Sequence, residues 1–117
     1  MFDENGDLLT DEWGDTLRAN AGIRDSALSL HAKVVAYTLT SRAQPIHDEG
    51  WMSWPSIGLL ARDCGMSRAR VFTALAELRD AGLIRWEQWY YGQSNRYTLD
   101  YLAMMELRTP ARTSRRR

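Results

Sequence analysis

The segment from Leu60 to Val71 constrains the fold more than any other part of this chain. Ala61 is small enough for two helices to touch at its position, and Gly65 follows it by four residues. Glycine accepts a positive φ without steric strain, so Gly65 can end one helix in a tight turn. Val71, six residues after the glycine, can anchor the next helix in a core. The spacing predicts two short helices joined by a three-residue turn, 64–66.

Start and stop signals flank this segment. Pro55-Ser56 predicts the start of a helix over 57–63, and Ser67 predicts the N-cap of a helix that runs through Ala81 to a stop at Gly82. Ser29 predicts the cap of an earlier helix over 30–42. The apolar residues of this earlier helix recur at the spacing of one buried stripe: Ala32, Val35, Ala36 and Leu39.

β-forming residues follow the helix that ends at Gly82. They predict a strand over 83–91, a turn over 92–95 and a returning strand over 96–99, which together make a hairpin. Trp51 to Trp54 predicts a short strand, 45–50 a loop and 101–107 a short closing helix. The order predicts an α+β fold, in which a three-helix core with a helix-turn-helix carries a two-stranded wing.

The flanking pattern extends the case for this fold. The chain carries Trp54-Pro55-Ser56, Leu60-Ala61, Gly65-Met66-Ser67-Arg68, Val71, Leu75, Leu78 and Ala81-Gly82-Leu83-Ile84 in this order. On these residues it resembles the winged helix-turn-helix domains of bacterial, phage and plasmid regulators and replication proteins. Leu28 to Lys33 resembles the start of the first helix in the phage and plasmid replication group. The resemblance covers 25–100 and implies a DNA-binding domain, but this fold serves many roles.

Such a domain places the N-terminal part of its recognition helix in the major groove. We therefore expect Arg68 to reach a guanine edge, Arg70 to contact phosphate, and Phe72 and Thr73 to meet a thymine methyl. Phe72 is equally compatible with the core. Ser56 would present the amides of a helix N-terminus to a phosphate. The full predicted interface adds Ser67 and Ala69 on the helix, and Gln93, Ser94, Asn95 and Arg96 on the wing.

The net charge is zero, but the charges are unevenly distributed. Residues 1–16 hold six acidic and no basic residues, and 108–117 hold five arginines and no acidic residue. We expect an acidic N-terminal arm over 1–24, in which a short helix is weakened by Gly14 and Gly22. We also expect a basic, disordered tail over 108–117. Three of its arginines would attract DNA phosphates without sequence preference: Arg115, Arg116 and Arg117.

Several classes of protein are disfavoured by the sequence. Cys64 is the single cysteine, so it cannot form an internal disulfide or a cysteine metal cluster. No apolar run is long enough to span a membrane, and the acidic start is unlike a secretory signal. The chain also has no glycine-rich phosphate loop and no metal-ligand or catalytic-triad spacing. We expect a cytoplasmic, non-enzymatic, one-domain protein without a cofactor or bound metal.

The expected partner is double-stranded DNA, bound as a homodimer because one recognition helix rarely gives enough specificity. Segments 8–24 and 101–107 are the expected dimer elements. The expected role is that of a small transcriptional regulator or a replication, partition or excision factor of a mobile element. The alternative is a protein-interaction module that uses the acidic arm and the aromatic wing. The wing aromatics would form that surface or a dimer surface, or pack on the core: Trp86, Trp89, Tyr90 and Tyr91.

The remaining aromatic, histidine and cysteine residues are given structural roles. We expect Trp51 and Trp54 in the core and Cys64 buried as a small hydrophobe at the turn. His31 and His47 lie far apart in sequence without ligand partners, so we expect them at the surface.

Overall fold

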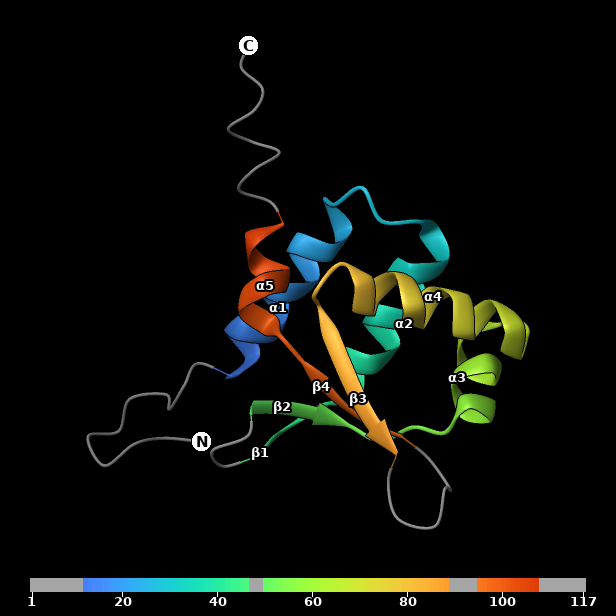
Figure 1. Cartoon of the computed structure of the whole chain (residues 1–117). Helices are drawn as coiled ribbons and strands as arrows, with labels where there is room; N and C mark the ends of the chain where they lie inside the picture. The colour runs from blue at the N-terminus through green and yellow to red at the C-terminus, as the bar shows by residue number, and fades with distance from the viewer. Residues whose placement is uncertain (1–11, 47–49, 89–94, 108–117) are drawn as a thin grey trace.

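The computed structural model describes residues 12–46, 50–88 and 95–107 of this 117-residue chain (Figure 1). Its elements follow one another in this order: α1 (Glu12–Arg24), α2 (Leu30–Ser41), β1 (Gln44–Ile46), β2 (Gly50–Ser53), α3 (Ile57–Cys64), α4 (Arg68–Asp80), β3 (Ile84–Gln88), β4 (Asn95–Leu99) and α5 (Tyr101–Glu106). The α+β class is confirmed, and helices and sheet share one core.

The predicted helix boundaries near the turn are confirmed by their caps. Ser29, Ser56 and Ser67 are the N-caps of α2, α3 and α4. The hydroxyl oxygen of each serine accepts a hydrogen bond from the amide three residues later. Gly65 ends α3 with a φ of 67°, and Gly82 follows α4 with a φ of 79°. These caps satisfy amide and carbonyl groups that a helix end otherwise leaves without partners.

Part of the core lies between α2 and α4. The stripe predicted on α2 is buried, with Ala32, Val35, Ala36 and Leu39 each 0% exposed. It meets the buried face of α4, formed by Val71, Ala74, Leu75 and Leu78. The carboxylate of Glu77 fixes this pair of helices further, since its two oxygens accept hydrogen bonds from the amide and hydroxyl of Ser29 at 2.8 and 2.7 Å.

The sheet is larger than the sequence indicated. It has four antiparallel strands in the order β1-β2-β4-β3, so the wing strands β3 and β4 continue into β2 and β1. The loop predicted over 45–50 was wrong at its start, because β1 pairs with β2 and sets Pro45 opposite Trp51. Proline has no N–H to donate to a ladder, and an edge strand such as β1 tolerates it. Asn95, predicted in the turn, is the first residue of β4.

Helix α1 is part of the packed domain, which differs from the expected arm over 1–24. Ala19 and Ile23 are fully buried, and α1 lies beside α5 (Figure 1). A Cβ added at Gly22 would stand 1.8 Å from the carbonyl oxygen of Met104 on α5. The glycine expected to weaken this helix therefore allows two backbones to touch. Residues 1–11 lie outside the described part of the chain.

Stacked aromatic rings join the sheet to the helices. Trp51 is half-buried and stacks on Tyr101 of α5 with ring centroids 4.7 Å apart, and Trp54 is also half-buried rather than fully enclosed. On the wing, Trp86 packs against Tyr97 at 5.7 Å and lies under the guanidinium of Arg79. Trp86 thus takes the packing role; Trp89, Tyr90 and Tyr91 lie outside the described residues.

Candidate nucleic-acid interface

Helices α3 and α4 meet across the turn that the sequence predicted. The amide of Met66 donates to the carbonyl of Ala61 at 3.0 Å, and the amide of Gly65 donates to that of Arg62 at 3.3 Å. These bonds close α3 and direct the chain into Ser67, whose hydroxyl accepts from the amide of Arg70 at 3.1 Å. The turn therefore fixes where the N-terminal end of α4 projects.

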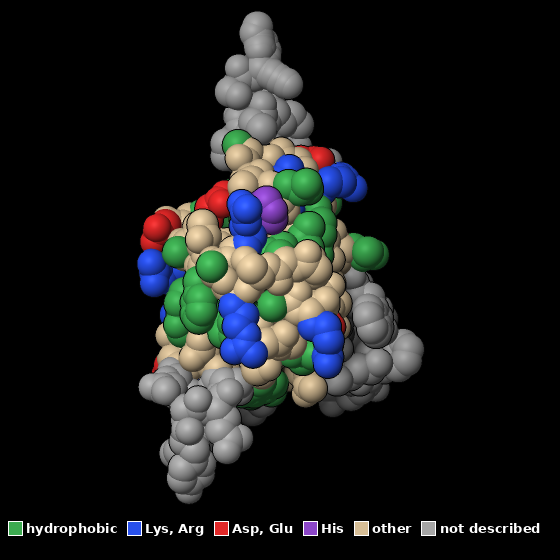
Figure 2. Space-filling view, turned by 90° about the vertical axis from the view of Figure 1, so that its right-hand side faces the viewer, with side chains coloured by type: hydrophobic (Ala, Val, Ile, Leu, Met, Phe, Trp, Pro, Cys, Tyr) green, Lys and Arg blue, Asp and Glu red, His purple; other side chains and the backbone are tan. Residues whose placement is uncertain are grey.

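The first two turns of α4 present nearly all their side chains to solvent. Val71 is buried, whereas the predicted interface residues around it are exposed: Ser67, Arg68, Ala69, Arg70, Phe72 and Thr73. Phe72, which sequence left open between core and surface, is 56% exposed. Figure 2 shows the side of the molecule that carries α3 and the start of α4, with Lys and Arg side chains spread across it among hydrophobic ones. The predicted residues thus share one accessible face.

This face carries positive charge without nearby acids. Residues 64–76 contain Arg68 and Arg70 and no aspartate or glutamate, and neither arginine forms an ion pair with any described residue. The nearest acids along the chain are engaged: Arg42 binds Asp63, and Ser29 binds Glu77. Hydrogen bonds from the amide of Ser29, which has the larger effect, and from its hydroxyl lower the pKa of Glu77 below its ordinary value. Glu77 therefore stays ionised, but it lies beyond the first two turns of α4, and the charges on the start of the helix itself are those of Arg68 and Arg70.

Arg68 reaches back toward the N-terminus of α3. A Cβ added at Gly58 would lie 3.1 Å from Nη2 of Arg68, and 4.0 Å from the hydroxyl oxygen of Ser56. Ser56 and Arg68, which were predicted to contact a phosphate and a base, therefore both lie close to Gly58. This position suits a phosphate better than the guanine edge we expected, because a guanine contact needs the guanidinium to extend outward from α4.

The hydroxyl groups of the interface have defined roles. Ser56 and Ser67 accept bonds from helix amides, and a hydroxyl that accepts one hydrogen bond still has a proton to donate. Thr73 donates its proton to the carbonyl of Ala69 at 3.1 Å, so it turns its methyl group and an acceptor oxygen to its surroundings.

The wing is less open than the sequence indicated. Arg96 is bound by Glu87 of β3 at 2.5 Å, and only 23% of its side chain is exposed. The amide nitrogen of Asn95 donates to the phenol oxygen of Tyr97 at 3.2 Å. Gln93 and Ser94 on the wing, and Arg115, Arg116 and Arg117 in the tail, lie outside the described residues. Nη2 of Arg96 and the side-chain amide of Asn95 are therefore both engaged within the wing.

One exposed cation near this face was missed by the sequence reasoning. The Arg62 side chain on α3 is 77% exposed, and its Nε stands 4.0 Å from the nearer oxygen of Asp63. The signal was present, because Ile57, Leu60 and Ala61 mark the inner side of α3 and Arg62 does not share it.

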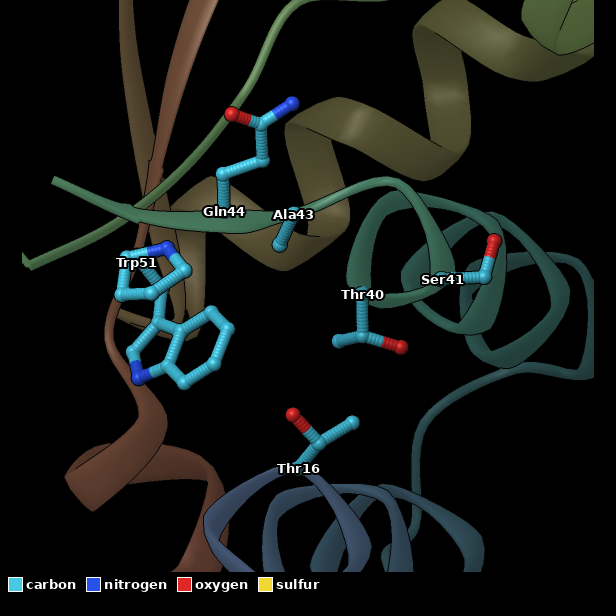
Figure 3. A pocket seen from close by; sticks show the side chains of 7 residues that line it. Thr16, Thr40, Ser41, Ala43, Gln44 and Trp51 are labelled. Carbon is cyan, nitrogen blue, oxygen red and sulfur yellow. The ribbon is translucent and has the colours of Figure 1, made fainter. Parts of the chain in front are cut away.

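A cavity of about 290 Å³ opens elsewhere, beside α1, the end of α2 and β1 (Figure 3). Thr16 and Thr40 face each other across it, with Trp51 at its side. The hydroxyls of Thr16 and Thr40 donate to Tyr101 and Asn20, at 3.3 and 2.9 Å. None of the lining residues comes from α3 or α4, so the cavity is separate from the charged face.

Metal-ligand types, the cysteine and one histidine are among the described residues. In that part of the chain, no three His, Cys, Asp or Glu side chains gather as a metal site would require. Cys64 is half-buried rather than fully buried, and its sulfur lies 3.2 Å from the hydroxyl of Thr38. His31 is exposed as expected, and His47 lies outside the described residues. Across the same ranges, no helix has the length and apolar character needed to cross a bilayer.

Sequence comparison matches the centre of this fold to a known family. Residues 27–84 match the model of a family described as a helix-turn-helix domain, from just before α2 to the start of β3. No curated protein matches the chain. The match includes α2, α3 and α4, and a domain of this kind implies DNA as the partner. This chain therefore contains a helix-turn-helix domain over residues 27–84.

Proposed function

We propose that the chain binds double-stranded DNA in a sequence-specific manner, with the start of α4 in the major groove. The observation that carries this proposal is the exposed start of α4, residues 67–73, which carries Arg68 and Arg70 and no acid. A major groove accommodates one α-helix, and the surrounding phosphates attract arginines. The proposal requires no large movement of the described core, since the face is already open.

The contacts divide into two kinds. Arg70 binds a phosphate at the side of the groove, and Arg68 binds another together with the amides at the start of α3, next to Ser56. The wing, through Gln93, Ser94 and Asn95, follows the adjacent backbone or minor groove. Arg115, Arg116 and Arg117 add contacts that do not depend on sequence. Phosphate contacts set the register of α4, and the rest of its exposed face meets the bases.

The biological form of the proposal is a homodimer that acts as a small regulator or a replication, partition or excision factor of a mobile element. The resemblance of Leu28 to Lys33 to phage and plasmid replication proteins supports the role. Leu17 of α1 and Leu102 of α5 are 69% and 66% exposed, so each of these helices still offers an apolar side chain to a second copy. Two copies would double the base contacts and make the operator symmetric.

Fluorescence anisotropy with labelled duplexes at two salt concentrations tests the proposal. We expect Arg68→Ala and Arg70→Ala each to weaken binding by about 1 kcal/mol, roughly fivefold in Kd, and to reduce the salt slope by about one. Arg96→Ala should have a smaller effect, because Glu87 already binds that guanidinium.

The matched control is Arg24→Ala, which removes an exposed arginine from α1, where Asp25 pairs with it. It should leave duplex binding unchanged. An equal loss for Arg24→Ala and Arg68→Ala would show general charge attraction instead of binding by α4. Absence of duplex binding at low salt would contradict the proposal and favour the protein-interaction alternative.

A further inference from the structure

A ridge on one side of α4 is apolar. Ala69, Phe72 and Ala76 recur there at i, i+3 and i+7; Ala69 and Phe72 are exposed, and Ala76 is half-buried. Phe72 stands out most, with 56% of its surface exposed although the core beside it is well filled. The ring adjoins the exposed Ala69, and an apolar patch exposed beside arginines is a candidate contact surface for a partner.

Few groups on this ridge can read a base by hydrogen bonding. Alanine and phenylalanine side chains have no hydrogen-bond donor or acceptor, and the Thr73 hydroxyl already donates its hydrogen bond to the carbonyl of Ala69. Arg68 leans toward Gly58, away from the ridge. Bidentate contacts to purine edges, which specify guanine or adenine, are therefore not available at the centre of this face.

Thymine offers the complementary chemistry. Its C5-methyl group is the apolar feature that base pairs present in the major groove. The charge near the ridge favours this occupant over an apolar protein groove, since Arg68 and Arg70 are exposed on the same first turns of α4 and 64–76 carry no acid. A surface with exposed arginines and an apolar ring is complementary to a DNA major groove, which has phosphates along its edges and thymine methyl groups within it.

We infer that α4 recognises thymine by apolar contact between Phe72 and the C5-methyl group, with Ala69 and the methyl of Thr73 beside it. This inference rests on the proposed DNA binding and specifies which bases it selects. Specificity then comes from methyl positions in A·T pairs, while the arginines provide affinity without choosing a base. The preferred sites are rich in thymine on the strand that faces the ridge.

Replacement of thymine by deoxyuridine tests the inference at the level of one methyl group. Deoxyuridine keeps the hydrogen bonds of the base pair and lacks only the methyl. A duplex is first selected from a random library with the full-length protein, and its thymines are then replaced one at a time. We expect each contacted position to weaken binding about fourfold, the value of one buried methylene-sized group.

Variants at Phe72 assign the effect to the ring. With Phe72→Ala, the thymine and deoxyuridine duplexes should bind equally, whereas Phe72→Leu should keep part of the difference. Both changes are at an exposed position, and circular dichroism checks that the fold is retained. The control is Leu30→Ala, since Leu30 is 72% exposed at the start of α2 and should leave the discrimination unchanged.

The outcomes separate the two proposals. Equal binding of thymine and deoxyuridine duplexes by the unaltered protein would overturn methyl recognition and leave DNA binding by α4 intact. A difference that persists in Phe72→Ala would overturn the role of this ring. If no duplex binds at all, the proposed function itself fails, and the inference falls with it.

Discussion

The two ends of this domain use their residues in opposite ways. At one end, α1 and α5 pack so closely that Gly22 must lack a side chain, and Ala19, Ile23 and Met104 are fully buried. At the other end, α3 and α4 pack together with Val71 buried and leave the start of α4 exposed, with arginines and Phe72 in solvent. The first end buries its surface in internal contacts, and the second leaves its surface exposed to solvent.

This difference shows where sequence change affects stability and where it affects binding. A close backbone contact cannot adapt to an added atom, because both sides are fixed by their own helices. An exposed helix face can change its side chains with little effect on folding. Variants at the α1–α5 end should therefore alter unfolding, and variants on α4 should alter affinity.

The largest expected effect is at Gly22. Gly22→Ala places a methyl group 1.8 Å from the carbonyl oxygen of Met104, so α5 must move or α1 must bend. We expect a loss of about 3 kcal/mol in the free energy of unfolding, the upper end of the usual range for overpacking. Urea denaturation followed by tryptophan fluorescence measures it. A loss below the error of the fit would show that α1 does not lie against α5 as described.

An intermediate effect is expected at Glu77, which holds α4 to the start of α2. Glu77→Gln removes the charge from its hydrogen bonds with Ser29, and we expect a loss of about 1 kcal/mol at neutral pH after allowance for solvent. The amide and hydroxyl of Ser29 hold the pKa of Glu77 below its ordinary 4.5. Its stabilisation is thus complete above pH 4.5 and is lost as the pH falls through the lowered value.

Thermal unfolding at several pH values measures this dependence. The difference between Glu77→Gln and the unaltered protein should shrink as the solution becomes more acidic. Glu106→Gln is the control, because Glu106 is exposed on α5 and the described residues provide it with no ion pair. A gap for Glu77→Gln that stays constant down to low pH would mean that the charge is not what Ser29 stabilises.

The smallest effect on stability is expected at Gly58, which makes a matched pair with Gly22. Gly58→Ala adds the same methyl group within a helix, but its closest contact is the flexible end of Arg68 at 3.1 Å. Alanine also favours the helix, so we expect stability to be unchanged or to rise by up to about 1 kcal/mol. Duplex affinity should fall slightly as Arg68 is displaced. A destabilisation as large as that of Gly22→Ala would remove the contrast between the two ends.

Local signals made the helix-turn-helix predictable from sequence. The serine caps, Gly65 and Gly82 act within a few residues of themselves, so the boundaries of α2, α3 and α4 followed from the chain alone. Helix α1 did not, because Gly22 reads as a weak helix position until Met104, far along the chain, is placed beside it. Strand β1 was missed for a similar reason, since Pro45 disfavours a strand except at the edge that β2 provides.

In the candidate site, too, features set by local sequence were predictable and features set by distant contacts were not. The exposure of 67–70 and 72–73 followed from helical periodicity with Val71 in the core. The positions of two arginines did not follow, because each depends on a partner in another element. Arg68 lies beside Gly58 of α3, and Arg96 is held by Glu87 of β3. Side-chain direction at an interface thus depends on tertiary contacts that spacing alone does not encode.

The most direct test of the account is a map of which backbone amides sense DNA. In two-dimensional NMR spectra of the isotope-labelled full chain, a selected duplex should shift the amides of 67–73 and of 56–58 most. The amides of α1 and α5 should stay nearly unchanged at the same protein and salt concentrations. Shifts concentrated in α1 and α5, with 67–73 unaffected, would contradict the claim that the α3–α4 end is the DNA-binding face.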